Sequence, residues 1–172
     1  AEPTRAPAPA GKVAVTVETV AGGLVHPWSL QFLPDGDMLV TERPGRLRLV
    51  GRDGTLSQPI AGVPPVFATG QGGLLDVAID PRFAATGLVY FSFAEPRGAG
   101  SNGTSVARAR LVRQGGGGRL EAVEIVFRQQ PAGSGALHFG SRLAFARDGS
   151  LFVTLGERYH SKDRAQALDD AE

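Results

Sequence analysis

The chain has 172 residues, of which 42% are hydrophobic and 20% charged, so it can bury a core and is not a disordered chain. No apolar run approaches the roughly 18 residues of a membrane span, and a net charge of +1 argues against a nucleic-acid-binding role. The lack of cysteine excludes disulfides, cysteine-ligated metals and a thiol nucleophile. The 24 glycines and 12 prolines predict a chain rich in turns.

The two ends differ in composition from the middle. Residues 1–11 (AEPTRAPAPAG) are typical of a flexible, Ala/Pro-rich leader, and we expect the folded domain to occupy residues 12–172. A start at Ala-Glu-Pro is what signal-peptidase cleavage after small residues leaves, which favours a periplasmic or secreted protein; the alternative is an artificial boundary. Residues 165–172 offer one or two helical turns at most.

Between residues 13 and 155 the hydrophobic pattern alternates with period two, which predicts β-strands. The first expected strand is the β-branched run KVAVTVETV at residues 12–20. A four-stranded antiparallel meander with tight turns is expected next, and four further strands follow it. The expected strands of the meander are 28–33, 38–42, 46–50 and 55–60, and the later ones are 75–79, 88–93, 104–112 and 120–128.

One unit of this pattern recurs along the chain. FLPDGDMLVT at residues 32–41 matches FARDGSLFVT at residues 145–154, and residues 75–93 hold a looser copy. A single small sheet cannot cover both of its faces, whereas sheets arranged around an axis cover one another. The repeat therefore predicts an all-β fold of about three β-propeller blades, with a β-sandwich as the competing architecture.

Three loops carry polar residues that a fold alone does not require. The loop TGQGG at residues 69–73 has glycines that allow close approach of a ligand, and Gln71 offers both a donor and an acceptor. The alternative is a plain glycine-rich turn with Gln71 in solvent. This loop is a poor phosphate-binding motif, because no Lys-Ser/Thr and no helix follow it.

The other two loops are LHFGSR at residues 137–142 and GERYH at residues 156–160. His138 could act as a general base or be a structural histidine, and Arg142 could pair with an anion. Glu157 could orient His138, bind a cation or be a solvated charge. One loop leads into the first strand of its repeat and the other follows the second, so antiparallel pairing predicts that His138 and Glu157 are neighbours.

The rest of the sequence offers weaker candidates for a functional site. His26 and Trp28 are interpreted as mainly structural, and His160 as exposed. No His-x-His motif or carboxylate cluster predicts a metal site in this stretch, and no Gly-x-Ser-x-Gly motif supports a serine hydrolase.

With these residues in view, the chain resembles the soluble aldose sugar dehydrogenases that use pyrroloquinoline quinone (PQQ), within the glucose/sorbosone dehydrogenase-like family. The resemblance rests on HPWSLQFLPDGDMLVTERPGRLRLV, GQGGLLDVAIDPRF, LVYFSFAEP, IVFRQQP, SGALHFGSRLAFARDGSLFVTLGER and the tail AQ-L-D. It implies a six-bladed β-propeller with PQQ on one face near the axis.

The resemblance also implies roles for single residues. His138 matches the base that takes the proton of the sugar C1 hydroxyl as hydride moves to PQQ C5, which yields the lactone. Glu157 matches its carboxylate partner, and Gln71 matches the glutamine at the substrate and cofactor pocket. Arg142 is expected among the cofactor-binding residues. Gln166 is expected to contact substrate, although Ala167 replaces an aspartate usual in that tail.

The family's Ca²⁺ ligands and its other PQQ-binding cations are expected beyond residue 172, so the sequence is interpreted as the N-terminal half of the propeller. We expect an aldose substrate, an unidentified electron acceptor, and pairing with the missing half or with a second copy, because open sheet edges and apolar faces would be exposed. Two other functions stay open. One is a metal-dependent sugar lactonase, for which Glu157 is the candidate ligand, and the other is a non-catalytic binding module.

Overall fold

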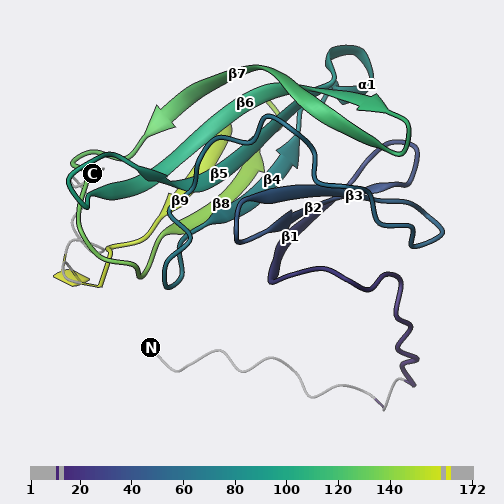
Figure 1. The fold of residues 1–172 in the computed structure, drawn as a ribbon, viewed down its shortest axis with the longest axis horizontal. Coiled ribbons are helices and arrows are strands. Elements are labelled where there is room, and N and C mark those ends of the chain that lie inside the picture. The colour runs from purple at the N-terminus through teal and green to yellow at the C-terminus, as the bar shows by residue number, and fades with distance from the viewer. Residues whose placement is uncertain (1–10, 12–13, 160–161, 164–172) are drawn as a thin grey trace.

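The computed structural model describes residue 11, residues 14–159 and residues 162–163. These residues form strands with one short helix, in three consecutive antiparallel sheets (Figure 1). The first sheet contains β1 (Pro27–Phe32), β2 (Met38–Glu42) and β3 (Arg46–Val50); the second contains β4 (Leu74–Ile79), β5 (Leu88–Pro96), β6 (Asn102–Gln114) and β7 (Gly117–Arg128), with α1 (Phe83–Thr86) between β4 and β5; the third contains β8 (Gly140–Phe145) and β9 (Leu151–Leu155).

The predicted fold class is confirmed. Each sheet is a meander of strands consecutive in the chain, and the sheets pack in a row in which β4 contacts β1, β2 and β8. This is the arrangement of about three propeller blades, not of two sheets packed face to face as in a sandwich. Residues 1–10 of the expected leader and the expected helical turns at 165–172 lie outside the described residues.

The predicted repeat is also confirmed, down to the hydrogen bonds of its turns. The amide of Leu33 donates to the Asp37 carbonyl at 2.8 Å, and the amide of Ala146 donates to the Ser150 carbonyl at 2.8 Å. Gly36 and Gly149 occupy the same place in the two turns, both with φ of 90°. This left-handed conformation suits glycine, which explains the shared Asp-Gly sequence.

A hydroxyl bridge recurs in each of the three sheets. In each sheet, the pairing of the first strand with the second shifts register near the start of the first strand. At this shift, a backbone amide of the first strand donates to a side-chain hydroxyl of the second strand instead of to a backbone carbonyl. These amide-to-hydroxyl pairs are Ser29 to Thr41 at 3.0 Å, Asp76 to Ser92 at 2.9 Å, and Arg142 to Thr154 at 3.0 Å.

Two of these hydroxyls also join one sheet to the next. Thr41 donates to the Leu75 carbonyl at 2.6 Å, and Ser92 donates to the Ser141 carbonyl at 2.8 Å. The acceptor lies at the equivalent position of the following sheet in both cases, so the contact between sheets repeats with the fold.

The buried carboxylate of Asp76 connects all three sheets. It lies on β4 and is 1% exposed, and it accepts hydrogen bonds from the Ser29 hydroxyl at 2.5 Å and from the Leu143 amide at 2.6 Å. The Arg142 guanidinium lies 3.2 Å from the same carboxylate. A buried charge that has these donors is compensated instead of being left unpaired.

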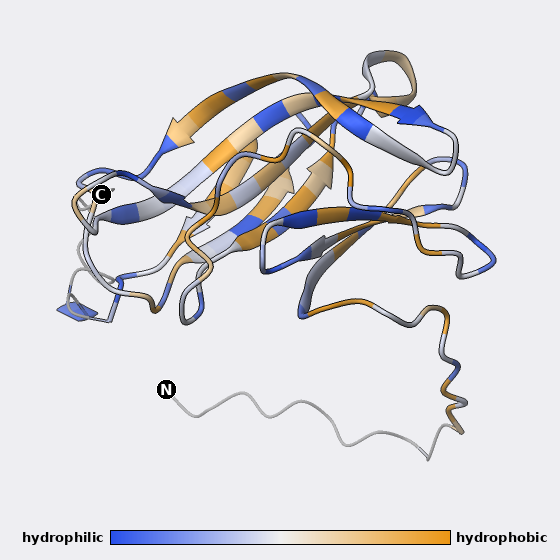
Figure 2. Cartoon of the chain, in the orientation of Figure 1, coloured by the Kyte–Doolittle hydropathy of each residue, from blue (hydrophilic) through white to orange (hydrophobic). Residues whose placement is uncertain are grey.

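Apolar side chains fill the spaces between the sheets, and the hydrophobic segments of the strands lie side by side in Figure 2. The largest cluster joins the first and second sheets through residues such as Leu39, Leu74 and Phe91, each at most 1% exposed. A smaller cluster around Val106 and Leu143 joins the second sheet to the third.

Two expected strands are wrong. Residues 14–20 form no strand, and Val15 and Val17 are 81% and 92% exposed, because no strand among the described residues covers this β-branched segment. Residues 55–60 run beside β3, and the amides of Ser57 and Ile60 donate to the Leu49 and Leu47 carbonyls at 2.8 Å, but the strand pairing of this segment is limited to an isolated bridge between Leu56 and Val50. The Ser57 carbonyl accepts a hydrogen bond from the Arg48 side chain at 2.9 Å. This carbonyl is therefore not used for pairing with a neighbouring strand.

Candidate active site

A pocket of about 350 Å³ opens where the first strands of the three sheets begin. Trp28 of β1, Leu75 of β4 and Gly140 of β8 contribute to its wall from equivalent ends of these strands. The lining residues are Trp28, Arg43, Gln71, Leu75, His138, Phe139 and Gly140. The pocket therefore combines two aromatic side chains, one cation, an amide and an imidazole.

His138 and Glu157 are in contact at this pocket, as antiparallel pairing predicted. Nδ1 of His138 is bonded to Oε1 of Glu157, and the two side chains are 39% and 17% exposed. The amide of His138 donates to Oε1 of Gln71 at 2.8 Å, and the amide of Gln71 donates to the Ala136 carbonyl at 2.8 Å. Three of the predicted site residues thus form one hydrogen-bonded group.

Two glycines allow the loops that carry His138 and Glu157 to meet. Gly140 pairs with Leu155 where β8 begins and β9 ends. A Cβ atom at Gly156 would lie 1.9 Å from the His138 carbonyl oxygen, and one at Gly140 would lie 2.6 Å from the Leu155 carbonyl carbon. Side chains at either position would force the two loops apart, which explains glycine at both.

The electrostatics of the pair fix the tautomer of His138. The hydrogen bond from His138 lowers the pKa of the Glu157 carboxyl, which stays ionised at neutral pH. An ionised carboxylate only accepts hydrogen bonds, so in the neutral imidazole of His138 the proton lies on Nδ1 and the lone pair on Nε2. Oε2 of Glu157 is buried and has no hydrogen-bond partner among the described residues.

Three further residues surround this group and were not predicted to do so. The Tyr159 ring packs edge-on against the His138 ring at a centroid distance of 5.4 Å. Arg43 lines the pocket, and its guanidinium donates to the Gly70 carbonyl. Trp28, interpreted from sequence as mainly structural, is 39% exposed and lines the pocket. Its equivalence to Leu75 in the repeat is the signal that could have placed it there.

The other predicted residues are not brought into this group. The Arg142 side chain is 68% exposed, is paired with Asp76 and does not line the pocket. The His26 carbonyl accepts from the Arg43 amide at 3.0 Å, which is a structural contact. Gln166 and His160 lie outside the described residues.

Within the described part of the chain, no three His, Cys, Asp or Glu side chains gather in a way that would hold a metal ion. None of the helical segments described is long and apolar enough to cross a membrane.

Residues 24–172 match the family described as Glucose / Sorbosone dehydrogenase. The chain belongs to this family. It is 43% identical to the aldose sugar dehydrogenase YliI of Escherichia coli (strain K12) over 161 residues, which cover 93% of this chain and 43% of that protein.

Solved structures agree with this assignment. A glucose dehydrogenase superposes with a TM-score of 0.84 at 52% identity, covering 90% of this chain and 48% of that one. The PQQ-bound aldose sugar dehydrogenase of Streptomyces coelicolor superposes with a TM-score of 0.75 at 32% identity, covering 90% and 45%. The chain therefore spans less than half the length of each of these relatives.

Proposed function

We propose that this chain supplies the proton-accepting side of the active site in a PQQ-dependent dehydrogenase that oxidises the C1 hydroxyl of an aldose to the lactone. The observation that carries the proposal is the group formed by Gln71, His138 and Glu157 at a pocket wall. Membership of the glucose/sorbosone dehydrogenase family supports the reaction class, and the PQQ-bound relative supports the cofactor.

The residues present suit part of such a cofactor. PQQ is a flat, tricarboxylated quinone, and the pocket offers the rings of Trp28 and Phe139 together with the Arg43 guanidinium. Flat apolar side chains can pack against a planar ring, and a guanidinium can bind a carboxylate through two hydrogen bonds. When bound, PQQ would supply the hydride acceptor.

His138 would act as the general base. Nε2 is the nitrogen with a free lone pair, so it would accept the proton of the C1 hydroxyl as the C1–H bond gives up its hydride. Glu157 would hold the ring through Nδ1 and stabilise the imidazolium that forms. The C1–O bond of the cyclic sugar then becomes the carbonyl of the lactone, and the proton leaves to solvent from His138.

Gln71 would orient the sugar. Its Oε1 already accepts from the His138 amide, so its NH₂ group is the part left to donate to a substrate hydroxyl. Contact of Gln166 with substrate, contact of Arg142 with the cofactor, a role for Ca²⁺ and an exported location stay predictions.

Replacing His138 by Ala in the full-length protein tests this proposal. With PQQ, Ca²⁺, an aldose and a dye acceptor, we expect kcat to fall by about 10²–10⁴-fold, because the base is removed from the reacting hydroxyl. His26→Ala is the matched control, since the His26 contact described above is made by its backbone carbonyl.

Wild-type turnover by His138→Ala would refute the assignment of the base. Hydrolysis of a sugar lactone by the unloaded protein, without PQQ and with a divalent metal, would instead favour the lactonase alternative. If the folded full-length protein neither oxidised an aldose nor bound PQQ, the binding-module alternative would be supported.

A further inference from the structure

Arg158 directly follows Glu157, and its guanidinium reaches back to the loop that carries His138. Nε donates to the Leu137 carbonyl at 3.1 Å, and the guanidinium carbon lies 4.0 Å from the centre of the Phe139 ring. Leu137 and Phe139 are the two neighbours of His138 in sequence. One planar group therefore contacts the two residues that flank His138 in the chain, while the backbone of Arg158 is linked to Glu157 by a peptide bond.

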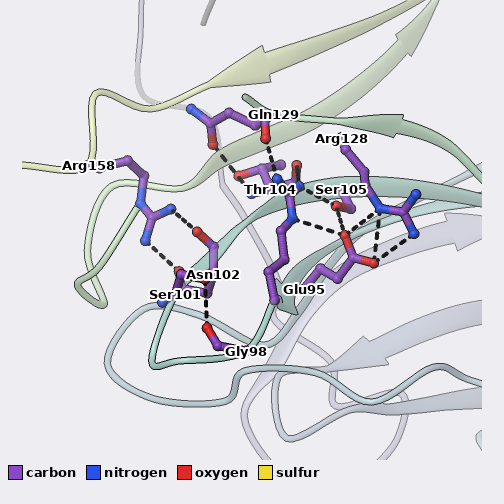
Figure 3. Close-up of polar contacts among 10 residues, drawn as sticks. Glu95, Gly98, Ser101, Asn102, Thr104, Ser105, Arg128, Gln129 and Arg158 are labelled. Atoms are coloured by element: carbon purple, nitrogen blue, oxygen red, sulfur yellow. Dashed lines mark hydrogen bonds and ion pairs between the residues drawn. The ribbon is translucent and has the colours of Figure 1, made fainter. Parts of the chain in front are cut away.

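The same guanidinium is anchored to the second sheet. Nη2 donates to Oδ1 of Asn102 at 2.6 Å and to the Gly135 carbonyl at 2.9 Å. Asn102 is 0% exposed, begins β6, and has its amide and carbonyl bonded to Gly133 at 2.8 and 3.1 Å. Figure 3 shows Arg158 pointing toward Asn102. The anchor is thus a fixed point of another sheet.

We infer that Arg158 is a positioning residue that fixes the His138–Glu157 pair against the pocket. The inference concerns the geometry of the pair, and its consequence for turnover rests on the proposed function. A lysine could supply the charge but could not make the same set of contacts, because a guanidinium presents five N–H donors in one plane and an ammonium does not.

The surroundings of Arg158 differ from those of an ordinary ion pair. Its bonded partners among the described residues are backbone carbonyls, the Asn102 amide oxygen and an aromatic face, and burial lowers the pKa of its guanidinium. Glu95, the carboxylate drawn in Figure 3, is bonded instead to Arg97 and Arg128 at 3.1 and 2.9 Å. Burying a cation costs solvation free energy, and among the described residues no carboxylate is bonded to Arg158 to offset that cost, so its hydrogen bonds to the two loops are what hold it in place. This makes a role in holding the two loops the better explanation.

The first test observes the pair directly, without cofactor. In the wild-type protein, the Nδ1 proton of His138 bonded to Glu157 should give a downfield imidazole N–H resonance in ¹⁵N-edited NMR spectra. In Arg158→Met we expect this resonance to broaden or disappear, because the loops separate and the proton exchanges with water. Arg128→Met is the matched control: it removes an arginine of the same region that contacts Glu95, and it should leave the resonance in place.

Arg158→Lys separates geometry from charge and serves as the second variant if Arg158→Met does not fold. Because both variants lack the planar set of N–H donors, we expect Arg158→Lys to lose the resonance as Arg158→Met does. A retained resonance in a folded Arg158→Met or Arg158→Lys protein would overturn the inference.

The second test is a double-mutant cycle on turnover by the PQQ-loaded, full-length protein. Arg158→Met should lower kcat about tenfold or more with little change in KM, since displacing a catalytic pair weakens reaction more than binding. Added to Glu157→Gln, it should have no further effect, because both act through the same imidazole. Fully additive losses would contradict the inference. A wild-type protein without turnover would count against the proposed function alone, and the NMR test would still decide the role of Arg158.

Discussion

Glu157 links the site to the acid stability of the protein. Its pKa in the folded state is lowered by the hydrogen bond from His138, below the ordinary value of 4.5. A carboxyl with a depressed folded-state pKa contributes stability above its unfolded pKa and loses that contribution as the pH falls through the folded value. The stabilisation from Glu157 is therefore present at pH 7 and is lost below about pH 4.5.

Glu157→Gln tests this linkage. We expect the variant to be less stable than wild type at pH 7, and the difference in free energy of unfolding to shrink as the pH falls below 4.5, as measured by urea unfolding. The pKa values of Asp35, Glu42 and Glu95 are also lowered, so both proteins should weaken in acid, and the difference is the informative quantity. A difference that stayed constant with pH would contradict the prediction.

Single residues show where sequence reasoning succeeds. The contact of His138 with Glu157 is predictable because both flank one hairpin, whose antiparallel pairing dictates where its ends meet. Gln71 reaches His138 from the loop before β4, and Arg158 is bonded to Asn102 of β6. Contacts of this kind depend on how sheets pack and on side-chain direction, and alternation of hydrophobic residues reports neither.

At the scale of elements, the hydroxyl bridges predict different costs for equivalent substitutions. Ser92 is 0% exposed and bonds both the Asp76 amide and the Ser141 carbonyl, whereas Thr154 is exposed and bonds the Arg142 amide. Ser92→Ala should cost about 2 kcal/mol, because two buried groups lose their partner, and Thr154→Ala less than about 1 kcal/mol.

Thermal or urea unfolding of the two variants measures these costs. Equal losses would show that the bridge between sheets adds nothing to the bond within a sheet. Thr41→Ala serves as a second buried example, since Thr41 also donates to the following sheet at 2.6 Å.

Strands were predictable from the sequence where an alternating hydrophobic segment has a partner strand beside it. The strands of the repeat occur as expected because each alternates and each has a partner in a tight hairpin. The segment at residues 14–20 has the stronger β-branched composition but no partner strand among the described residues, and it stays irregular. Strand propensity describes a fit to a pleated surface, so it requires that surface to be present.

At the scale of the molecule, the row of sheets exposes apolar side chains at both ends. Leu30 and Phe32 of β1 are 47% and 60% exposed, and Phe152 of β9 is 64% exposed. We expect the 172-residue chain, studied alone, to self-associate with rising concentration, because exposed apolar faces of adjoining sheets cover one another. Sedimentation velocity measures this.

Phe152→Ser should weaken that association, and Arg119→Gln, a change at an exposed arginine of β7, should not. A single monomeric species at all concentrations would refute the prediction.

The carboxylate of Asp76 gives the row of sheets a further property. It is shared by Ser29 of the first sheet and Leu143 of the third, so two sheets that are not consecutive in the chain depend on one side chain of the sheet between them. If either outer sheet moved away, a charge buried in the interior would lose one of its donors while the other kept it in place. We therefore expect local opening at either end to be penalised by the Asp76 carboxylate at the centre, and the three sheets to open together instead of one at a time. The His138 loop leads directly into β8, which Asp76 holds through the Leu143 amide, so we expect this loop to be ordered together with the three sheets.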